Sequence, residues 1–233
     1  MLETSLDIRE SGGPNRIALP DFLSHRNPRD DYYRTVVGGS TNYLESPEFA
    51  QESIEASLDN PRLREFFRSK LKGEILVDCG GGREEFMKKL AVEWGAGAYL
   101  NLDGQLQAYD KSSNWQEYSE PFPGVDGARI FSMRFRSPNR EGETEIQGID
   151  GDMLRVVARF PDNSVNYVLN AIDNDIILVG DYWRALAAEI ERTTKTGGVV
   201  FGYNNLLLNH LSPSKFKDTE LIEAPNSGIF EKV

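Results

Sequence analysis

The chain has 233 residues, 39% of them hydrophobic, and 37 acidic against 26 basic residues give it a formal net charge of −11. This length fits one domain with at most an appended segment, and it is enough to bury a sizeable core. A charge of this sign repels phosphate backbones, so we expect nucleic acid not to be the substrate, although Arg129, Arg134, Arg136 and Arg140 can form a local basic patch.

Other features of the composition exclude several classes of protein. No apolar run approaches the roughly 18 to 20 residues that cross a bilayer. The first residues, Met1–Asp7, have neither the basic nor the apolar region of a signal peptide. Cys79 is the sole cysteine, which excludes an internal disulfide and a cysteine-based zinc cluster. We therefore expect a cytoplasmic protein with no metal and no membrane segment.

The N-terminal third is predicted to be a lead-in followed by two helices. The first thirty residues are polar and interrupted by glycine and proline. Ser46-Pro47 predicts the start of a helix that runs to about Leu58, and Asn60-Pro61 predicts a second one over 62–71, ended by Gly73. Residues 1–70 are thus expected to precede a core at 71–233 and to be able to act as a lid.

The core alternates short apolar runs with longer amphipathic ones. Strands are predicted at Ile75–Asp78, Ala98–Asp103, Glu145–Ile149, Val165–Asn170 and Val199–Tyr203, and helices at 83–94 and 181–195. Asp181 is the expected N-cap of the second helix, and Gly197-Gly198 ends it. This order predicts an α/β fold, with a mostly parallel twisted sheet and helices on both faces.

An insertion at 105–144 interrupts this alternation, with about twice the length that an ordinary crossover needs. Within it, the run Ala128–Arg136 is predicted to pair with the following strand across Ser137–Arg140. The insertion is either a substrate-facing elaboration or a surface loop.

Four of the predicted strands end in residues suited to a nucleoside, and ligands of open parallel sheets bind at the carboxyl ends of strands. Asp103 also follows Asp78 at close to the spacing of about 20 residues at which an acid reaches ribose hydroxyls. The four sets are Asp78 with Gly80–Gly82, Asp103 with Gly104, Gly151 with Asp152 and Met153, and Asn170 with Asp173.

The run from Ile75 to Asn205 resembles the Rossmann-like class I S-adenosylmethionine-dependent methyltransferases. The blocks that carry the resemblance are Val77-Asp78-Cys79-Gly80-Gly81-Gly82, Asn101-Leu102-Asp103-Gly104, Gly151-Asp152-Met153, Arg159–Leu169 with its Phe160-Pro161-Asp162, and Gly197–Phe201. The resemblance implies S-adenosylmethionine as cofactor. It also implies a closing antiparallel hairpin, expected at Thr219–Ala224 and Ile229–Val233.

The resemblance further implies a role for each strand-end residue. Gly80 and Gly82 would let the backbone pass close to the cofactor, and Asp78 would orient its amino-acid end. Asp103, beside Gly104, would accept bonds from both ribose hydroxyls. The remaining roles are adenine recognition by Asp152 and Met153 and a place under the sulfonium for Asn170. Capping of a following helix is the alternative for Asp103 and Asp152, and bonding to loop backbone is the alternative for Asn170.

Two positions depart from the family pattern. Glu84 stands where a third glycine is common, so its carboxylate can either bond the cofactor's ammonium or repel its carboxylate, with Arg83 beside it to compensate. Asn166 stands where the family usually has an aspartate.

The acceptor is expected to be a small molecule first and a protein second. Candidates for chemistry beside the sulfonium are Asn170, Asp173 and His210, while Cys79 is expected to be a packed core residue. One alternative is a methyltransferase-like fold that binds a nucleoside or a partner without catalysis. A nicotinamide-dependent oxidoreductase is a third reading, but its fingerprint needs glycine at position 85, where Glu85 stands.

Overall fold

The structure of the chain is a computed structural model, which describes residues 60–81, 86–103, 119–132, 144–169, 182–202, 205–222 and 227–233. The helix predicted from Ser46 to Leu58 lies outside the described residues, as does the rest of segment 1–59. In the described part, no helix is long and apolar enough to cross a membrane.

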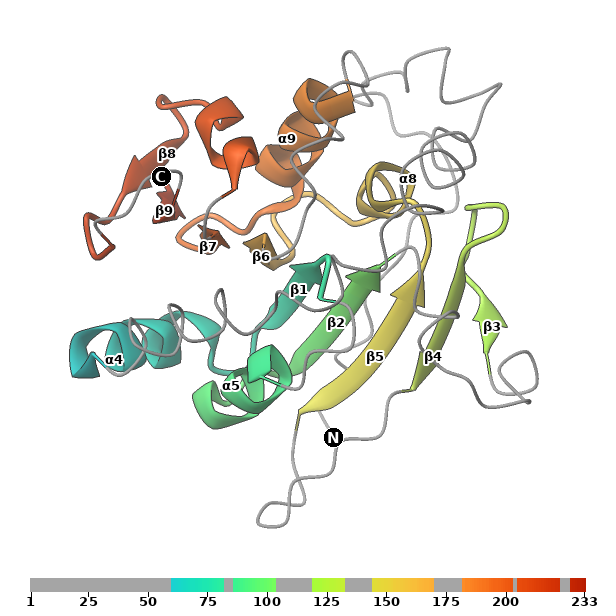
Figure 1. Cartoon of the computed structure of the whole chain (residues 1–233), viewed down its shortest axis with the longest axis horizontal. Helices are drawn as coiled ribbons and strands as arrows, with labels where there is room; N and C mark the ends of the chain where they lie inside the picture. The colour runs from blue at the N-terminus through green and yellow to red at the C-terminus, as the bar shows by residue number, and fades with distance from the viewer. Residues whose placement is uncertain are drawn as a thin grey trace, which may run out of the picture.

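A central sheet of five parallel strands organises the fold (Figure 1). In spatial order these strands are β5 (Glu145–Asp150), β2 (Ala98–Asp103), β1 (Ile75–Cys79), β6 (Asn166–Leu169) and β7 (Val199–Gly202). The predicted parallel α/β sheet is confirmed. β2 has the predicted bounds, while β1 and β5 run one residue further than expected.

Antiparallel strands extend the sheet at both edges. Beside β5 lie β4 (Arg129–Ser132) and then β3 (Glu120–Pro121), so the insertion pairs with the following strand as predicted. Beside β7 lie β9 (Gly228–Lys232) and then β8 (Phe216–Asp218), which form the expected closing hairpin.

The first arm of that hairpin lies earlier in the chain than predicted. β8 occupies 216–218, whereas 219–224 was expected. Phe216 is the buried residue of this arm and pairs with Lys232, and Glu220 has a φ of 55°, which an extended strand does not adopt. The prediction placed the arm too late because Phe216 is a single apolar residue between two lysines.

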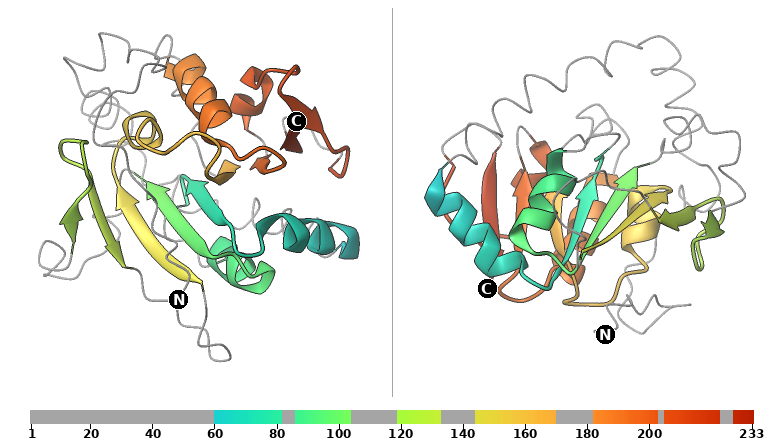
Figure 2. Two further views of the ribbon diagram at one scale, coloured as in Figure 1. Left: turned by 180° about the vertical axis from the view of Figure 1, so that it is seen from behind. Right: turned by 90° about the horizontal axis from the view of Figure 1, so that it is seen from below.

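Helices cover both faces of the sheet, as predicted (Figures 1 and 2). On one side lie α4 (Pro61–Leu71) and α5 (Phe86–Trp94), and on the other α8 (Met153–Val157) and α9 (Tyr182–Thr193). The 3-10 helix η4 (Leu206–His210) follows β7. Each face of the sheet has its own buried apolar cluster. One is formed with residues of α8 and α9, and the other with residues of α4 and α5.

α4 begins where the sequence predicts. The Asn60 side chain accepts a hydrogen bond from the Arg62 backbone N–H at 2.9 Å, Pro61 fills the first turn, and Gly73 follows the helix with a φ of 73°. Phe67 then stacks on Trp94 of α5, with ring centroids 4.5 Å apart. α4 is therefore packed against the core.

Candidate functional site

The carboxyl ends of β1, β2 and β5 bring polar residues to one face of the sheet. Asp103 and Asp150 are direct partners across β2 and β5, and Arg129 of β4 is the partner of Asp150. Paired residues point to the same face, so these three side chains form one row at the carboxyl edge. Gly80 joins this edge through its N–H, which donates to the Leu102 carbonyl at 2.8 Å.

The turn after β1 requires glycine for two reasons. Gly80 has a φ of 83°, in the left-handed region that favours glycine. A Cβ at Gly81 would lie 2.7 Å from Asn101 Oδ1 and 2.8 Å from Asp78 Oδ2, closer than real Cβ contacts. Gly82 and the departure from the family pattern at Glu84 lie outside the described residues.

Asp78 lies beneath this turn and is fully buried. The Tyr99 hydroxyl donates a hydrogen bond to Asp78 Oδ2 at 2.6 Å. Tyr99 and Asn101 are residues that the sequence analysis missed. A signal was present, because Tyr99, Asn101 and Asp103 occupy alternate positions of one strand and so share a face.

Asp103 and Asp150 differ in exposure. Asp103 at the end of β2 is half-buried, whereas Asp150 is buried. Asp150 was missed because the predicted strand ended one residue before it. The predicted acid at this edge therefore has a second carboxylate beside it.

Asp152 caps a helix, which is the alternative that the sequence left open. Its Oδ1 accepts a hydrogen bond from the Arg155 N–H at 3.0 Å at the start of α8. Asp152 and Met153 are both almost completely buried. The cap holds this loop beside the ends of β2 and β5, where Gly151 donates its N–H to the Asp103 carbonyl at 3.3 Å. Adenine recognition by these residues stays a prediction.

The fourth set of predicted residues, and one member of the second, are not described by the structure. Gly104, Asn170 and Asp173 lie outside the described residues. Asn205, which the sequence analysis did not single out, bonds the last described carbonyl of β6: its Nδ2 donates to Leu169 O at 3.1 Å, while its Oδ1 caps η4 at Leu207 N. Asn205 is thereby fixed beside the carboxyl end of β6.

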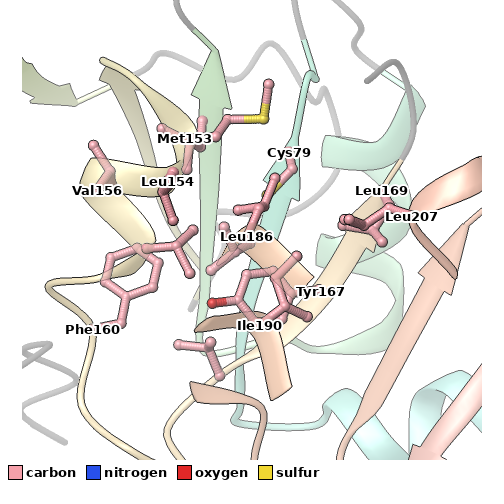
Figure 3. Packing of buried hydrophobic residues seen from close by; sticks show 14 of the residues in the cluster. Cys79, Met153, Leu154, Val156, Phe160, Tyr167, Leu169, Leu186, Ile190 and Leu207 are labelled. Carbon is pink, nitrogen blue, oxygen red and sulfur yellow. The ribbon is translucent and has the colours of Figure 1, made fainter. Parts of the chain in front are cut away.

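Two candidate reactive side chains have contrasting environments. Cys79 points into the apolar cluster that also holds Met153, Leu154 and Tyr167 (Figure 3). Burial, and then the charge of Asp78, raise the pKa of its thiol far above the ordinary value, so it stays protonated and unreactive. His210 is exposed at the end of η4. In the ranges that the structure describes, no group of three or more His, Cys, Asp or Glu residues can hold a metal ion.

No protein-family model matches the sequence, and no curated protein matches it. Among solved structures, the chain is similar to the phosphoethanolamine N-methyltransferase 2 of Haemonchus contortus in complex with S-adenosyl-L-methionine, with 18% identity and a TM-score of 0.40 over 75% of this chain and 34% of that one. It is also similar to a mutant of the 16S rRNA (adenine(1408)-N(1))-methyltransferase of Catenulisporales acidiphilia, with 12% identity and a TM-score of 0.33 over 61% of this chain and 56% of that one.

A third similar structure is the precorrin-6y C5,15-methyltransferase of Geobacter metallireducens, with 12% identity and a TM-score of 0.36 over 74% of this chain and 84% of that one. The chain thus spans about a third and about half of the length of the first two of these structures. Each TM-score lies below 0.5, so the likeness by itself adds nothing to what the sheet order shows.

Proposed function

We propose that this chain binds S-adenosylmethionine at the carboxyl edge of the sheet and transfers its methyl group to a small molecule. The order of the strands carries the proposal. From β5 to β7 the parallel strands follow the order of a nucleotide-binding sheet, but antiparallel β9 stands where a dinucleotide-binding sheet has its sixth parallel strand. An antiparallel hairpin at this place is what the resemblance to class I methyltransferases implies.

The described residues at this edge fit such a cofactor. Asp103 presents a half-buried carboxylate of the kind that accepts bonds from two ribose hydroxyls. Gly80 and Gly81 let the backbone come close to a ligand, because neither position carries a side chain and Gly81 has no room for one. Asp152 and Met153 are held beside them by the helix cap.

The cofactor would supply a methyl group on a sulfonium, which is reactive by nature. The work left to the chain is to hold the acceptor in line with that methyl group and to exclude water. The described part of the insertion supports a substrate-facing role, because the turn between β3 and β4 lies at the same end of the sheet as the tips of β2 and β5 (Figure 1).

After a small molecule, a protein is the second acceptor class that we consider. Nucleic acid is the third: the negative charge of the chain argues against it, but one of the similar structures is an rRNA methyltransferase, so the comparisons do not support excluding nucleic acid as the acceptor.

A second candidate function is cofactor binding without catalysis. It is favoured by the surroundings of two side chains that could in principle react: Cys79 is buried and stays protonated, and His210 is exposed on the surface of η4. A base is needed only for an acceptor that is protonated. Asn170 and Asp173, which remain candidates, lie outside the described residues.

Calorimetry with S-adenosylhomocysteine, combined with transfer of a radiolabelled methyl group from S-adenosylmethionine to cell extract, separates these functions. We expect tight binding and labelling of a small molecule. Binding without labelling would support the non-catalytic candidate, and binding of a nicotinamide dinucleotide instead would contradict both.

The site itself is tested by Asp103→Ala, which we expect to abolish most of the binding while the domain stays folded. Asp218→Ala is the matched control, because Asp218 is an exposed aspartate of the outer strand β8. Thermal stabilisation by S-adenosylhomocysteine that survives in Asp103→Ala would show that the site is assigned wrongly.

A further inference from the structure

A buried polar group supports the glycine turn from below. Asp78, Tyr99 and Asn101 are all fully buried and lie on the same face of neighbouring strands β1 and β2, where Asp78 is the direct partner of Asn101. Tyr99 is the partner of Leu76, two residues before Asp78, and its hydroxyl reaches diagonally to Asp78 Oδ2 at 2.6 Å.

The backbone of the turn rests directly on this group. The ideal Cβ position of Gly81 is 2.8 Å from Asp78 Oδ2 and 2.7 Å from Asn101 Oδ1. Both side chains are short and enclosed, and Asp78 is fixed by Tyr99, so neither can move away cheaply. The position of the Asp78 carboxylate thus determines how closely the turn packs onto the sheet.

We propose that Tyr99 is a positioning residue for the cofactor site: its hydroxyl holds the Asp78 carboxylate beneath Gly81 and thereby fixes the turn that receives the amino-acid end of the cofactor. The inference rests on the proposed function. It predicts that the Tyr99 hydroxyl affects binding of the amino-acid part of the ligand. The nucleoside part should not depend on it, because Asp103 at the end of the strand is proposed to bind that part.

The chain offers a matched control in its other fully buried tyrosine on the central strands. Tyr167 of β6 lies in the opposite cluster, and its hydroxyl shares a 2.6 Å hydrogen bond with Thr193 Oγ1. Tyr99→Phe and Tyr167→Phe each remove one buried hydroxyl and one hydrogen bond. Only the first of these bonds reaches the glycine turn.

The test measures two ligands on the full chain by calorimetry. S-adenosylhomocysteine has the amino-acid part, and 5′-methylthioadenosine is the same nucleoside thioether without it. The lost bond joins two protein groups, so its effect on affinity comes through the position of the Asp78 carboxylate, and we expect it to be about tenfold. We expect Tyr99→Phe to weaken S-adenosylhomocysteine by this amount and 5′-methylthioadenosine by no more than about twofold. Tyr167→Phe should change neither affinity.

Equal weakening of both ligands in Tyr99→Phe, or no weakening of either, would overturn the inference, since the hydroxyl would then only support the fold. Wild-type protein that binds neither ligand would overturn the proposed function and the inference with it. Asp78→Asn serves if Tyr99→Phe does not fold. It keeps the size of the side chain, and it should show the same selective loss of S-adenosylhomocysteine, whereas unchanged affinity would again contradict the inference.

Discussion

Asn166 shows how a departure from the family pattern can serve the fold. Its Oδ1 accepts a hydrogen bond from the Val199 N–H at 2.9 Å, and its Nδ2 donates to the Ile75 carbonyl at 3.3 Å. An aspartate can accept the first bond but cannot donate the second. Asn166 also begins β6, at the amino edge of the sheet and at the opposite end from Asp103. We therefore attribute this departure to strand packing and not to cofactor affinity.

We expect Asn166→Asp to lower the free energy of unfolding by about 1–3 kcal/mol, because a buried carboxylate would face the Ile75 carbonyl without a proton to donate. Urea denaturation measures the loss. Asn209→Asp, at an exposed position of η4, is the control and should cost clearly less. Affinity for S-adenosylhomocysteine should not change in the folded protein, and a selective loss of affinity would return Asn166 to the cofactor site.

Cys79 gives the protein an expected weakness at alkaline pH. Burial raises the pKa of the thiol from its ordinary value of 9.0, so above pH 9 the unfolded chain loses this proton while the native protein keeps it. The unfolded state then binds fewer protons, and the free energy of unfolding falls as pH rises, by up to about 1.4 kcal/mol per pH unit.

Urea denaturation from pH 8 to pH 10 tests this expectation. The fall should be shallower in Cys79→Ala than in the wild type. Tyr167, whose pKa burial also raises, adds a similar fall only above its own ordinary value of 10.0. Equal slopes for the two proteins in this interval would show that the thiol is not protected.

At the scale of elements, the predictable parts are those with a local cause. β2 was predicted with its actual bounds because its six residues, in which apolar and polar side chains alternate, are flanked in the sequence by Gly97 and Gly104. α4 was predicted because Asn60 and Pro61 mark its start. α8 was left open only as the helix that Asp152 could cap, because its five residues are too few to show a helical period. β3 and η4 were missed because they depend on what they pack against.

The same distinction applies to the site. Asp78, Asp103 and Asp152 were predicted from strand ends, and the structure brings the ends of those strands to one edge. Tyr99 and Asp150 have their partners, Asp78 and Asp103, on other strands, and the register that pairs the strands cannot be read from a single strand.

α4 is expected to be essential to the core. Phe67 is buried, stacks on Trp94 and meets Phe201 of β7 edge-on, with ring centroids 5.4 Å apart. Phe67→Ala should cost about 3–5 kcal/mol of unfolding free energy. Phe66→Ala is the matched control in the same helix, because Phe66 is only half-buried and should cost clearly less. Similar losses for the two variants would mean that α4 does not pack as described.

Across the whole molecule, the two edges of the central strands differ in kind. The amino edge is tied by backbone and side-chain bonds: Lys232 of β9 donates to the carbonyls of Glu191 and Thr194 at 2.7 Å each, and its own carbonyl accepts from the Gly197 N–H at 2.8 Å. The carboxyl edge instead holds the glycine turn and the row of Asp103 and Asp150. Backbone bonds also join the carboxyl edge, from Gly80 to Leu102 and from Gly151 to Asp103. The two edges therefore differ in their side chains, with a lysine at the amino edge and carboxylates beside glycines at the carboxyl edge.

This contrast predicts where a ligand changes hydrogen exchange. At short labelling times, S-adenosylhomocysteine should slow amide exchange in peptides that contain Gly80–Gly81, the end of β2 and the start of α8, because local opening there must release the ligand. Peptides that span Thr194–Val199, at the amino edge, should exchange as in the free protein. Mass spectrometry with and without the ligand measures both, and Asp103→Ala should abolish the difference. Protection confined to the amino edge would place the ligand at the opposite end of the sheet and contradict the site proposed for it.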